Sequence, residues 1–213
     1  MNGKIFISYC WAEPSGSIVN NWLVPAIKTA GINCLVDREA CGYNVNIDKF
    51  EADILNAAIV LLVLSPEFFC SMDCMYEASL AVSKCDVDKR VYVINLQDFN
   101  FRSDTKIFNE THERFLEKKR ELEEAMSKVS VEGRGLHKDR LRKINTIIGN
   151  LSKLWKMLGN KNSGEFKHIS KRNFELLCIK LKRSLEETVY ESDFITNAEL
   201  EPKFEAPSDN TPF

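Results

Sequence analysis

The chain has 213 residues, of which 44% are hydrophobic, enough to bury the core of one domain with additions or of two small domains. Its 29 basic and 31 acidic residues leave a formal net charge of -2, so no large positive field attracts nucleic acid or an anionic membrane. The longest apolar run, Ile54–Leu64, is interrupted by Asn56 and is too short to span a bilayer. We therefore expect a soluble protein whose partners include neither nucleic acid nor a membrane.

The cysteines indicate the compartment. There are seven, an odd number without regular spacing, and Cys34, Cys74 and Cys178 lie in apolar periodic segments, where a reduced thiol behaves as a small hydrophobe. Cys70, Cys74 and Cys85 lack paired CxxC units, and no histidine lies between them, which disfavours a metal site. The pattern predicts a reducing, cytoplasmic location and no bound metal.

The first hundred residues alternate short β-branched runs with helical periodicity, which predicts parallel strands joined by crossover helices. The run AIVLLVLS is apolar throughout, so we expect both of its faces to be covered and the strand to lie at the centre of the sheet. In chain order, the predicted elements are a strand at KIFISY (4–9), a loop over 14–17, a helix from 19 that ends at Gly31, a strand at INCLVD (32–37), a loop at REACGYNVN (38–46), a helix from about 47, the strand AIVLLVLS (58–65), a helix over 71–84 and a strand at RVYVINL (90–96).

The second half of the chain is richer in charged, helix-favouring residues. Two amphipathic stretches between about 108 and 158, separated by EGRG, predict a helical hairpin added to the domain. EFKHIS (165–170) predicts a short fifth strand, and the apolar spacing from Phe174 to Leu185 predicts a closing helix, so the domain is expected to span 1–190. Residues 191–213 carry three prolines and six acidic residues against one lysine, which predicts a disordered tail.

These elements predict an α/β protein of flavodoxin-like architecture, with a five-stranded parallel sheet and helices on both faces, for which we take the strand order 2-1-3-4-5 as the working expectation. Such a sheet binds ligands beyond the carboxyl ends of its strands, where the strand order reverses, here between the first and third strands. The helix that leaves this crevice, SMDCMYEASLAV, carries Glu77 among small and apolar residues. Helical spacing places Asp73, Cys74, Glu77 and Ala81 on one face, so Glu77 can point towards the crevice. The alternative is an ordinary solvated glutamate on the helix surface.

Four segments in order, KIFISYCWAE, GINCLVDRE, DKFEADILNAAIVLLVLSPEFF and S..C..E, resemble a TIR (Toll/interleukin-1 receptor) domain of the branch that cleaves NAD+. The resemblance covers roughly residues 3–98. It implies that Glu77 is the catalytic glutamate and that the loops after the first two strands contact the dinucleotide. The candidate substrate-binding residues are Tyr9, Cys10, Trp11, Asp37, Gly42, Phe50, Asp73 and Cys74.

This sequence departs from the family pattern at two places. Enzymatic TIR domains usually carry a tryptophan four residues before the glutamate, where this chain has Asp73. The pair after the tyrosine of the first strand is often basic or polar, whereas here it is Cys10 and Trp11. Trp11 offers either an aromatic surface for a base or plain packing.

A single carboxylate suits the implied reaction. The nicotinamide of NAD+ is already a cationic pyridinium and leaves as a neutral group, so no acid catalyst is needed, in contrast to the two carboxylates of most glycosidases. One carboxylate stabilises the developing sugar cation or orients the ribose hydroxyls. Attack by water gives ADP-ribose, and attack by a group of the same molecule gives a cyclic isomer. NAD+ is then the substrate, and no separate cofactor is expected.

The resemblance implies a role in immune defence or cell-death signalling, with self-association through contacts between TIR domains. A non-catalytic TIR interaction module is the alternative from another class. A third candidate is a nucleoside deoxyribosyltransferase, which shares a parallel sheet and glutamate-dependent N-glycosidic chemistry but would act on deoxynucleosides. A phosphoacceptor receiver domain is disfavoured because KIFISYC ends without an acidic pair for magnesium.

Overall fold

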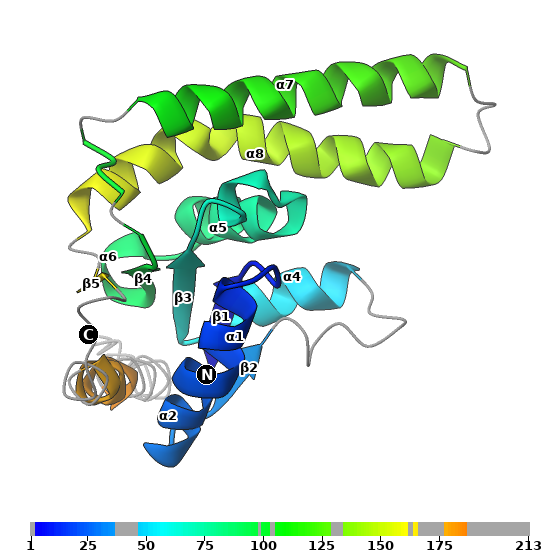
Figure 1. Ribbon diagram of the computed structural model, residues 1–213. Helices are drawn as coiled ribbons and strands as arrows, with labels where there is room; N and C mark the ends of the chain where they lie inside the picture. Colours follow the sequence, from blue (N-terminus) through cyan, green and yellow to red (C-terminus); the bar gives the residue numbers. More distant parts are fainter. Residues whose placement is uncertain are drawn as a thin grey trace, which may run out of the picture.

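The chain folds into a parallel sheet with helices on both faces (Figure 1). The strand order is β2-β1-β3-β4-β5, and every neighbouring pair is parallel, which confirms the predicted fold class and order. The computed structural model describes residues 3–36, 47–97, 99–102, 105–128, 134–161, 164–165 and 177–186.

The strands are β1 (Ile5–Tyr9), β2 (Cys34–Val36), β3 (Ile59–Leu64), β4 (Val91–Asn95) and β5 (Gly164–Glu165). The helical segments are α1 (Ser15–Ile18), the π-helical turn η1 (Val19–Leu23), α2 (Val24–Thr29), α4 (Ile47–Asn56), the 3-10 turn η2 (Phe68–Cys70), α5 (Met72–Lys84), α6 (Val87–Arg90), α7 (Lys106–Ser127) and α8 (Gly135–Asn160). A further helix occupies 177–186. None of the helices in the described part of the chain is long and apolar enough to cross a bilayer.

The helix after β1 begins earlier than the sequence pattern predicts. Ser15 is already helical, although the run of proline, serine and glycine from Pro14 favoured a loop. Pro14 stands immediately before the helix, where its missing N–H costs nothing. Gly16 permits the turn, because a Cβ at this position would lie 2.5 Å from the backbone oxygen of Trp11. The predicted loop over 14–17 is therefore wrong from Ser15 onward.

This helix changes geometry in its middle. Val24 N–H donates to the carbonyl of Val19, five residues back, which makes η1 a π-helical turn between α1 and α2. Pro25 follows directly and has no N–H to donate. A widened turn before it accommodates the proline within a continuous helical segment. Gly31 then takes a φ of +75°, which ends the helix as predicted.

β3 is the central strand of the sheet. All six of its residues are buried and lie between β1 and β4, which confirms that both of its faces are covered. Ile59, Leu61 and Val63 face a core shared with the first helical segment and helix 177–186. Val60, Leu62 and Leu64 face the second core, which contains α5 and the hairpin. Alternation along one strand thus separates the two helical layers.

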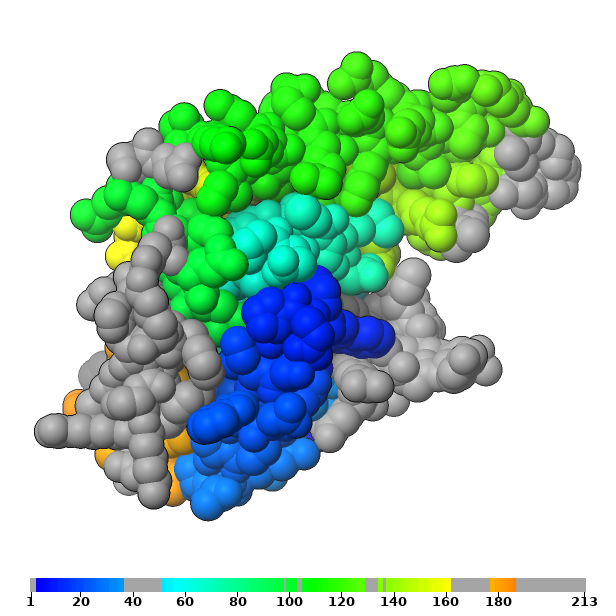
Figure 2. All heavy atoms as spheres, viewed as in Figure 1, coloured from blue at the N-terminus to red at the C-terminus, as the bar shows by residue number. Residues whose placement is uncertain are grey.

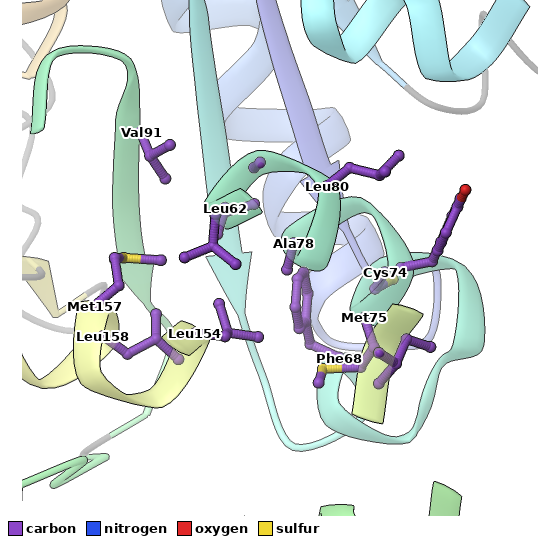
Figure 3. Close-up of a cluster of buried hydrophobic side chains, with 14 of the residues drawn as sticks. Leu62, Phe68, Cys74, Met75, Ala78, Leu80, Val91, Leu154, Met157 and Leu158 are labelled. Carbon is purple, nitrogen blue, oxygen red and sulfur yellow. The ribbon is translucent and has the colours of Figure 1, made fainter. Parts of the chain in front are cut away.

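The inserted hairpin, α7 and α8, packs on the outer side of α5 (Figures 1 and 2). Figure 3 shows Leu154 and Leu158 of α8 close to Leu62 of the sheet. At the far end of α8, Trp155 contacts three aromatic rings, with centroids 5.5 Å from Phe69, 5.2 Å from Phe101 and 5.5 Å from Phe108. The hairpin is therefore part of the main core and covers α5, the helix that carries Glu77.

The structure describes only part of the C-terminal region for which the sequence makes predictions. β5 begins at Gly164, one residue before the predicted EFKHIS strand, and pairs with Ile94 and Asn95 of β4. Residues 166–170 lie outside the described residues. Helix 177–186 agrees with the second part of the predicted closing helix, with Leu181 fully buried. The predicted tail over 191–213 lies outside the described residues.

Candidate active site

Hydroxyl groups join the two loops that leave β1 and β3. Ser15 Oγ donates to the carbonyl of Ala12 at 2.9 Å and lies 3.4 Å from Ser65 Oγ. Ser65 Oγ in turn accepts from the N–H of Phe68 at 3.3 Å. Ser15 and Ser65 are both buried. The loops therefore meet at the carboxyl edge of the sheet, at the point where the strand order reverses, as the topology predicts.

Glu77 lies in the middle of α5, and its side chain is 1% exposed. Among the described residues it is the one carboxylate or cation that is fully buried. This burial contradicts the alternative of a solvated surface glutamate. Taking a carboxylate out of water is costly, so such a group is kept for structure or for function. The negative charge of Glu77 contributes to raising the pKa of the Cys74 thiol, which places it close to that side chain.

Cys74 lies in the first turn of α5. It is 5% exposed, and its backbone N–H donates to the hydroxyl of the N-cap residue Ser71 at 3.3 Å. A side-chain hydrogen bond with Cys10, the first residue after β1, then burial, and then the charge of Glu77 raise the pKa of the Cys74 thiol. Cys10, Cys74 and Glu77 are therefore brought together, as expected for a site built from this loop and this helix.

The Cys10 thiol is the acidic member of the pair. The hydrogen bond from Cys74 lowers the pKa of Cys10 to about 6, against the opposing effects of burial and of the Glu67 charge. A hydrogen bond from the Ala12 backbone adds to the lowering. The pKa of the Cys10 thiol therefore lies below that of an ordinary cysteine. The sequence identified both cysteines as candidate binding residues, but it gave no sign that their thiols meet.

Tyr9 and Trp11 lie elsewhere around the same loop. The ring of Tyr9 is buried on the opposite face of the sheet from α5, and its hydroxyl donates to Oδ1 of Asn20 at 3.1 Å. Trp11 is 51% exposed, so its ring does not serve simply to fill the core. The two aromatic residues line a polar hollow of about 260 Å³, together with Glu13, Gly16, Ser17, Asn20 and Asn21.

Asp73 does not share the environment of its neighbours on the predicted helical face. Its side chain is 63% exposed and pairs with Nζ of Lys143 in α8 at 2.7 Å. Cys74 and Glu77 are buried at 5% and 1%, so burial separates Asp73 from them. At this position, where the resemblance led us to expect a tryptophan, the chain has a carboxylate that binds its inserted hairpin.

Three predicted substrate-binding residues cannot be placed in the site. Asp37 and Gly42 lie outside the described residues. Phe50 lies in α4, where the structure describes the backbone but not its side chain. Their assignment remains a prediction.

Sequence reasoning missed a polar junction beside the candidate site. Tyr76, directly before Glu77, donates its hydroxyl proton to Oε1 of Glu51 in α4 at 2.6 Å. Arg142 of α8 donates to the same oxygen at 2.7 Å. Tyr76 is 2% exposed. The one sequence feature that could have indicated this junction is a tyrosine, whose hydroxyl needs a hydrogen-bond partner when buried, among the apolar residues of this helix.

In the described part of the chain, no cluster of three or more histidine, cysteine, aspartate or glutamate residues has the arrangement of a metal site. The groups available for chemistry there are the buried carboxylate of Glu77, the thiols of Cys10 and Cys74, and the hydroxyl groups of the switch point. A carboxylate in a water-poor site interacts strongly with a cation that develops next to it.

The fold and this arrangement define a class: an open parallel α/β domain with a buried glutamate on the helix that leaves its switch point. The sequence model of the TIR domain matches residues 5–127, so the chain belongs to the TIR domain family. The match extends beyond the resemblance seen in the sequence and includes α7.

A comparison with solved structures agrees on the fold. The chain is similar to the TIR domains in the structure of the activated Roq1 resistosome directly recognizing the pathogen effector XopQ, with 11% identity and a TM-score of 0.50. The similarity covers 87% of this chain and 99% of the other. No curated protein matches the sequence.

Proposed function

We propose that this TIR domain cleaves the nicotinamide–ribose bond of NAD+, with Glu77 as the catalytic carboxylate. The observation that carries the proposal is the position of Glu77, a fully buried carboxylate on α5, the helix that follows β3. The switch point next to this strand is where an open parallel sheet binds its ligand. The family assignment is consistent with the proposal.

The chemistry requires only one charged group from the protein. Positive charge moves from the pyridinium of NAD+ to the ribose as the bond breaks, and nicotinamide leaves as a neutral molecule. A carboxylate beside the ribose stabilises that charge more in the transition state than in the ground state, which is the condition for catalysis. Water then completes a hydrolysis, and a nucleophile within the same molecule completes a cyclisation.

The burial of Glu77 places a condition on catalysis, because the carboxylate must become accessible to the substrate. With 1% of its surface exposed, the carboxylate touches substrate only after the chain around it has opened. Assembly of several copies is one route to an opened state, since the similar TIR domains belong to an activated resistosome. We include self-association, and a role in defence signalling, in this proposal. Activity is therefore measured over a range of protein concentrations, with sedimentation of the same samples.

The deciding experiment compares nicotinamide release from NAD+ by the wild type and by Glu77→Gln. The substitution keeps the size of the side chain and removes its charge, so we expect turnover to fall by about 10²- to 10³-fold or more. Ser79→Ala is the matched control, because Ser79 is a buried polar residue on the same helix that donates only to the Met75 carbonyl. This control should retain activity, and Glu77→Gln should remain folded by circular dichroism.

Three results oppose the proposal. Normal nicotinamide release by Glu77→Gln removes the catalytic assignment. Unfolding of the variant shows that Glu77 is a structural carboxylate. Wild-type protein that associates but never consumes NAD+ indicates a non-catalytic interaction module, and exchange of bases between deoxynucleosides without NAD+ cleavage indicates a deoxyribosyltransferase.

A further inference from the structure

A hollow of about 370 Å³ lies between the two helices of the inserted hairpin and the start of α5. This volume falls within the range of small-ligand sites. Figure 1 shows α7 and α8 side by side along the outer side of α5. None of the described residues that line the hollow belongs to the candidate active site. It is therefore a second place on the molecule where a ligand could be held.

The side of the hollow toward the core is apolar. Ile144 is 3% exposed, and Met72 and Leu122 are partly buried against the same core cluster. The apolar lining residues come from all three helices: Met72 of α5, Leu122 and Ala125 of α7, and Ile144 of α8. Water gains few hydrogen bonds at such a wall, so replacing it with an apolar group is favourable.

The polar residues of the hollow carry an excess of positive charge. Lys118 and Arg140 are cations and Glu121 is an anion, which leaves one positive charge in excess. Nζ of Lys118 donates to the carbonyl of Cys70 at 3.3 Å and lies 5.2 Å from the centre of the Phe115 ring. These contacts hold the ammonium group beside the hollow, and it has further N–H donors to offer.

Two other polar groups of the hollow have no partner in the described part of the chain. Nδ1 of His137 is buried, yet no hydrogen-bond partner lies within reach. A buried polar atom in this state is uncommon in proteins, and it indicates a place for a ligand atom. Arg140 is exposed and pairs with no carboxylate of the described residues, so its N–H donors can bind an acid group.

We propose that this hollow binds a small amphipathic anion, a medium-chain carboxylic acid. The apolar wall takes the hydrocarbon tail, and the carboxylate lies among Lys118, His137 and Arg140. A single excess positive charge matches a monoanion, whereas Glu121 repels the second charge of a phosphate monoester. The 370 Å³ correspond to roughly twelve water molecules at about 30 Å³ each, which admits a tail of about ten carbons.

A ligand in this hollow would join the hairpin to the helix that carries Glu77. It touches α7, α8 and Met72, the first residue of α5. Because the hollow exists only when these helices are packed together, the bound acid stabilises the folded state as its concentration rises. Binding is measured without NAD+, so its failure is distinct from a failure of the proposed function.

The first experiment titrates the full chain with decanoate, below its micelle concentration, by isothermal titration calorimetry. We expect one saturable site per chain and a thermal midpoint that rises with decanoate concentration. Decanol lacks the charge and acetate lacks the tail, so each should bind at least about tenfold more weakly. Three results overturn the proposal: no saturable binding of decanoate, equal binding of decanol, or inorganic phosphate that binds as tightly as decanoate.

The second experiment uses variants to locate the decanoate. Ala125→Phe fills the hollow and should abolish binding, and Arg140→Gln should weaken it about fivefold through loss of an exposed ion pair. Lys153→Gln is the matched control, because Lys153 is another exposed cation of α8 that does not line the hollow. It should bind decanoate as the wild type does.

Circular dichroism establishes that each variant is folded. Should Ala125→Phe fail to fold, the contrast between Arg140→Gln and Lys153→Gln decides the question. Equal affinities of these two variants would place the decanoate outside the hollow and overturn the proposal.

Discussion

The hydroxyl of Tyr76 lies 2.6 Å from Oε1 of Glu51 and donates a hydrogen bond to it. Arg142 donates to the same oxygen at 2.7 Å, and its guanidinium carbon lies 5.9 Å from the centre of the Tyr76 ring. The three residues belong to α5, α4 and α8, so one carboxylate holds three helices together. Because Tyr76 directly precedes Glu77, this junction fixes the segment that carries the candidate catalytic group.

The junction predicts a pH dependence of stability. Burial opposes ionisation of Glu51, but the hydrogen bonds from Tyr76 and Arg142 outweigh it and lower its pKa below 4.5. A lowered pKa in the folded state means that the stabilisation is present above pH 4.5 and is lost as the pH falls through the folded value. We expect Glu51→Gln to lower the thermal midpoint at neutral pH, and its deficit to shrink under acid conditions. A deficit that does not change with pH would show that the charge of Glu51 contributes nothing.

The aromatic contacts of Trp155 predict that the hairpin is held by packing. Trp155 is 9% exposed and contacts Phe69, Phe101 and Phe108. Trp155→Ala should therefore lower the free energy of unfolding by about 3 to 5 kcal/mol, as truncation of a buried aromatic residue does. Chemical denaturation measures this loss, and sedimentation should show an unchanged oligomeric state. A stable monomer with weakened association would instead assign Trp155 to an interface between copies.

Two glycines are expected to respond in opposite directions to the same substitution. Gly16→Ala places a methyl group 2.5 Å from the backbone oxygen of Trp11, and we expect it to destabilise the protein by about 1 to 3 kcal/mol through overpacking. Gly149 lies on an exposed face within α8 with nothing within 4 Å of an added Cβ. Gly149→Ala should stabilise by up to about 1 kcal/mol through helix propensity. Urea midpoints of the two variants test the contrast, which equal effects would contradict.

The lowered pKa of Cys10 predicts that this thiol reacts with iodoacetamide at a lower pH than an ordinary cysteine does. With a pKa of about 6, Cys10 should alkylate at a rate that rises through about pH 6, well below the range of an ordinary thiol. Cys74→Ala removes the hydrogen bond that lowers this pKa, so the rate should then rise at higher pH, because burial and the Glu67 charge still oppose ionisation. Peptide mapping reports Cys10 separately from exposed Cys70. An unchanged profile in Cys74→Ala would show that the thiol contact does not set the acidity.

The sequence by itself determined the architecture. The run AIVLLVLS is apolar at consecutive positions, and a strand can bury both faces only at the centre of a covered sheet, where β3 is found. The alternation of strands and helices predicted that the strands are parallel, because parallel neighbours require crossover connections, and the assumed order 2-1-3-4-5 is the one found. Local motifs led to the TIR family and to Glu77. The same local reasoning failed at Ser15, where proline, serine and glycine, usually found in turns, begin a helix.

Only the tertiary structure decided how the site is built. The inserted hairpin covers the outer side of α5, the helix that carries Glu77, and no local pattern predicts which helix covers another. Cys10 packs against the buried cluster that contains Cys74, because β1 contacts α5 although the two segments lie far apart in the chain. Asp73 turns to Lys143 of the hairpin, although helical spacing predicted a shared face with Glu77. Periodicity shows which side of a helix is apolar, whereas the long-range packing of elements decides what each side meets.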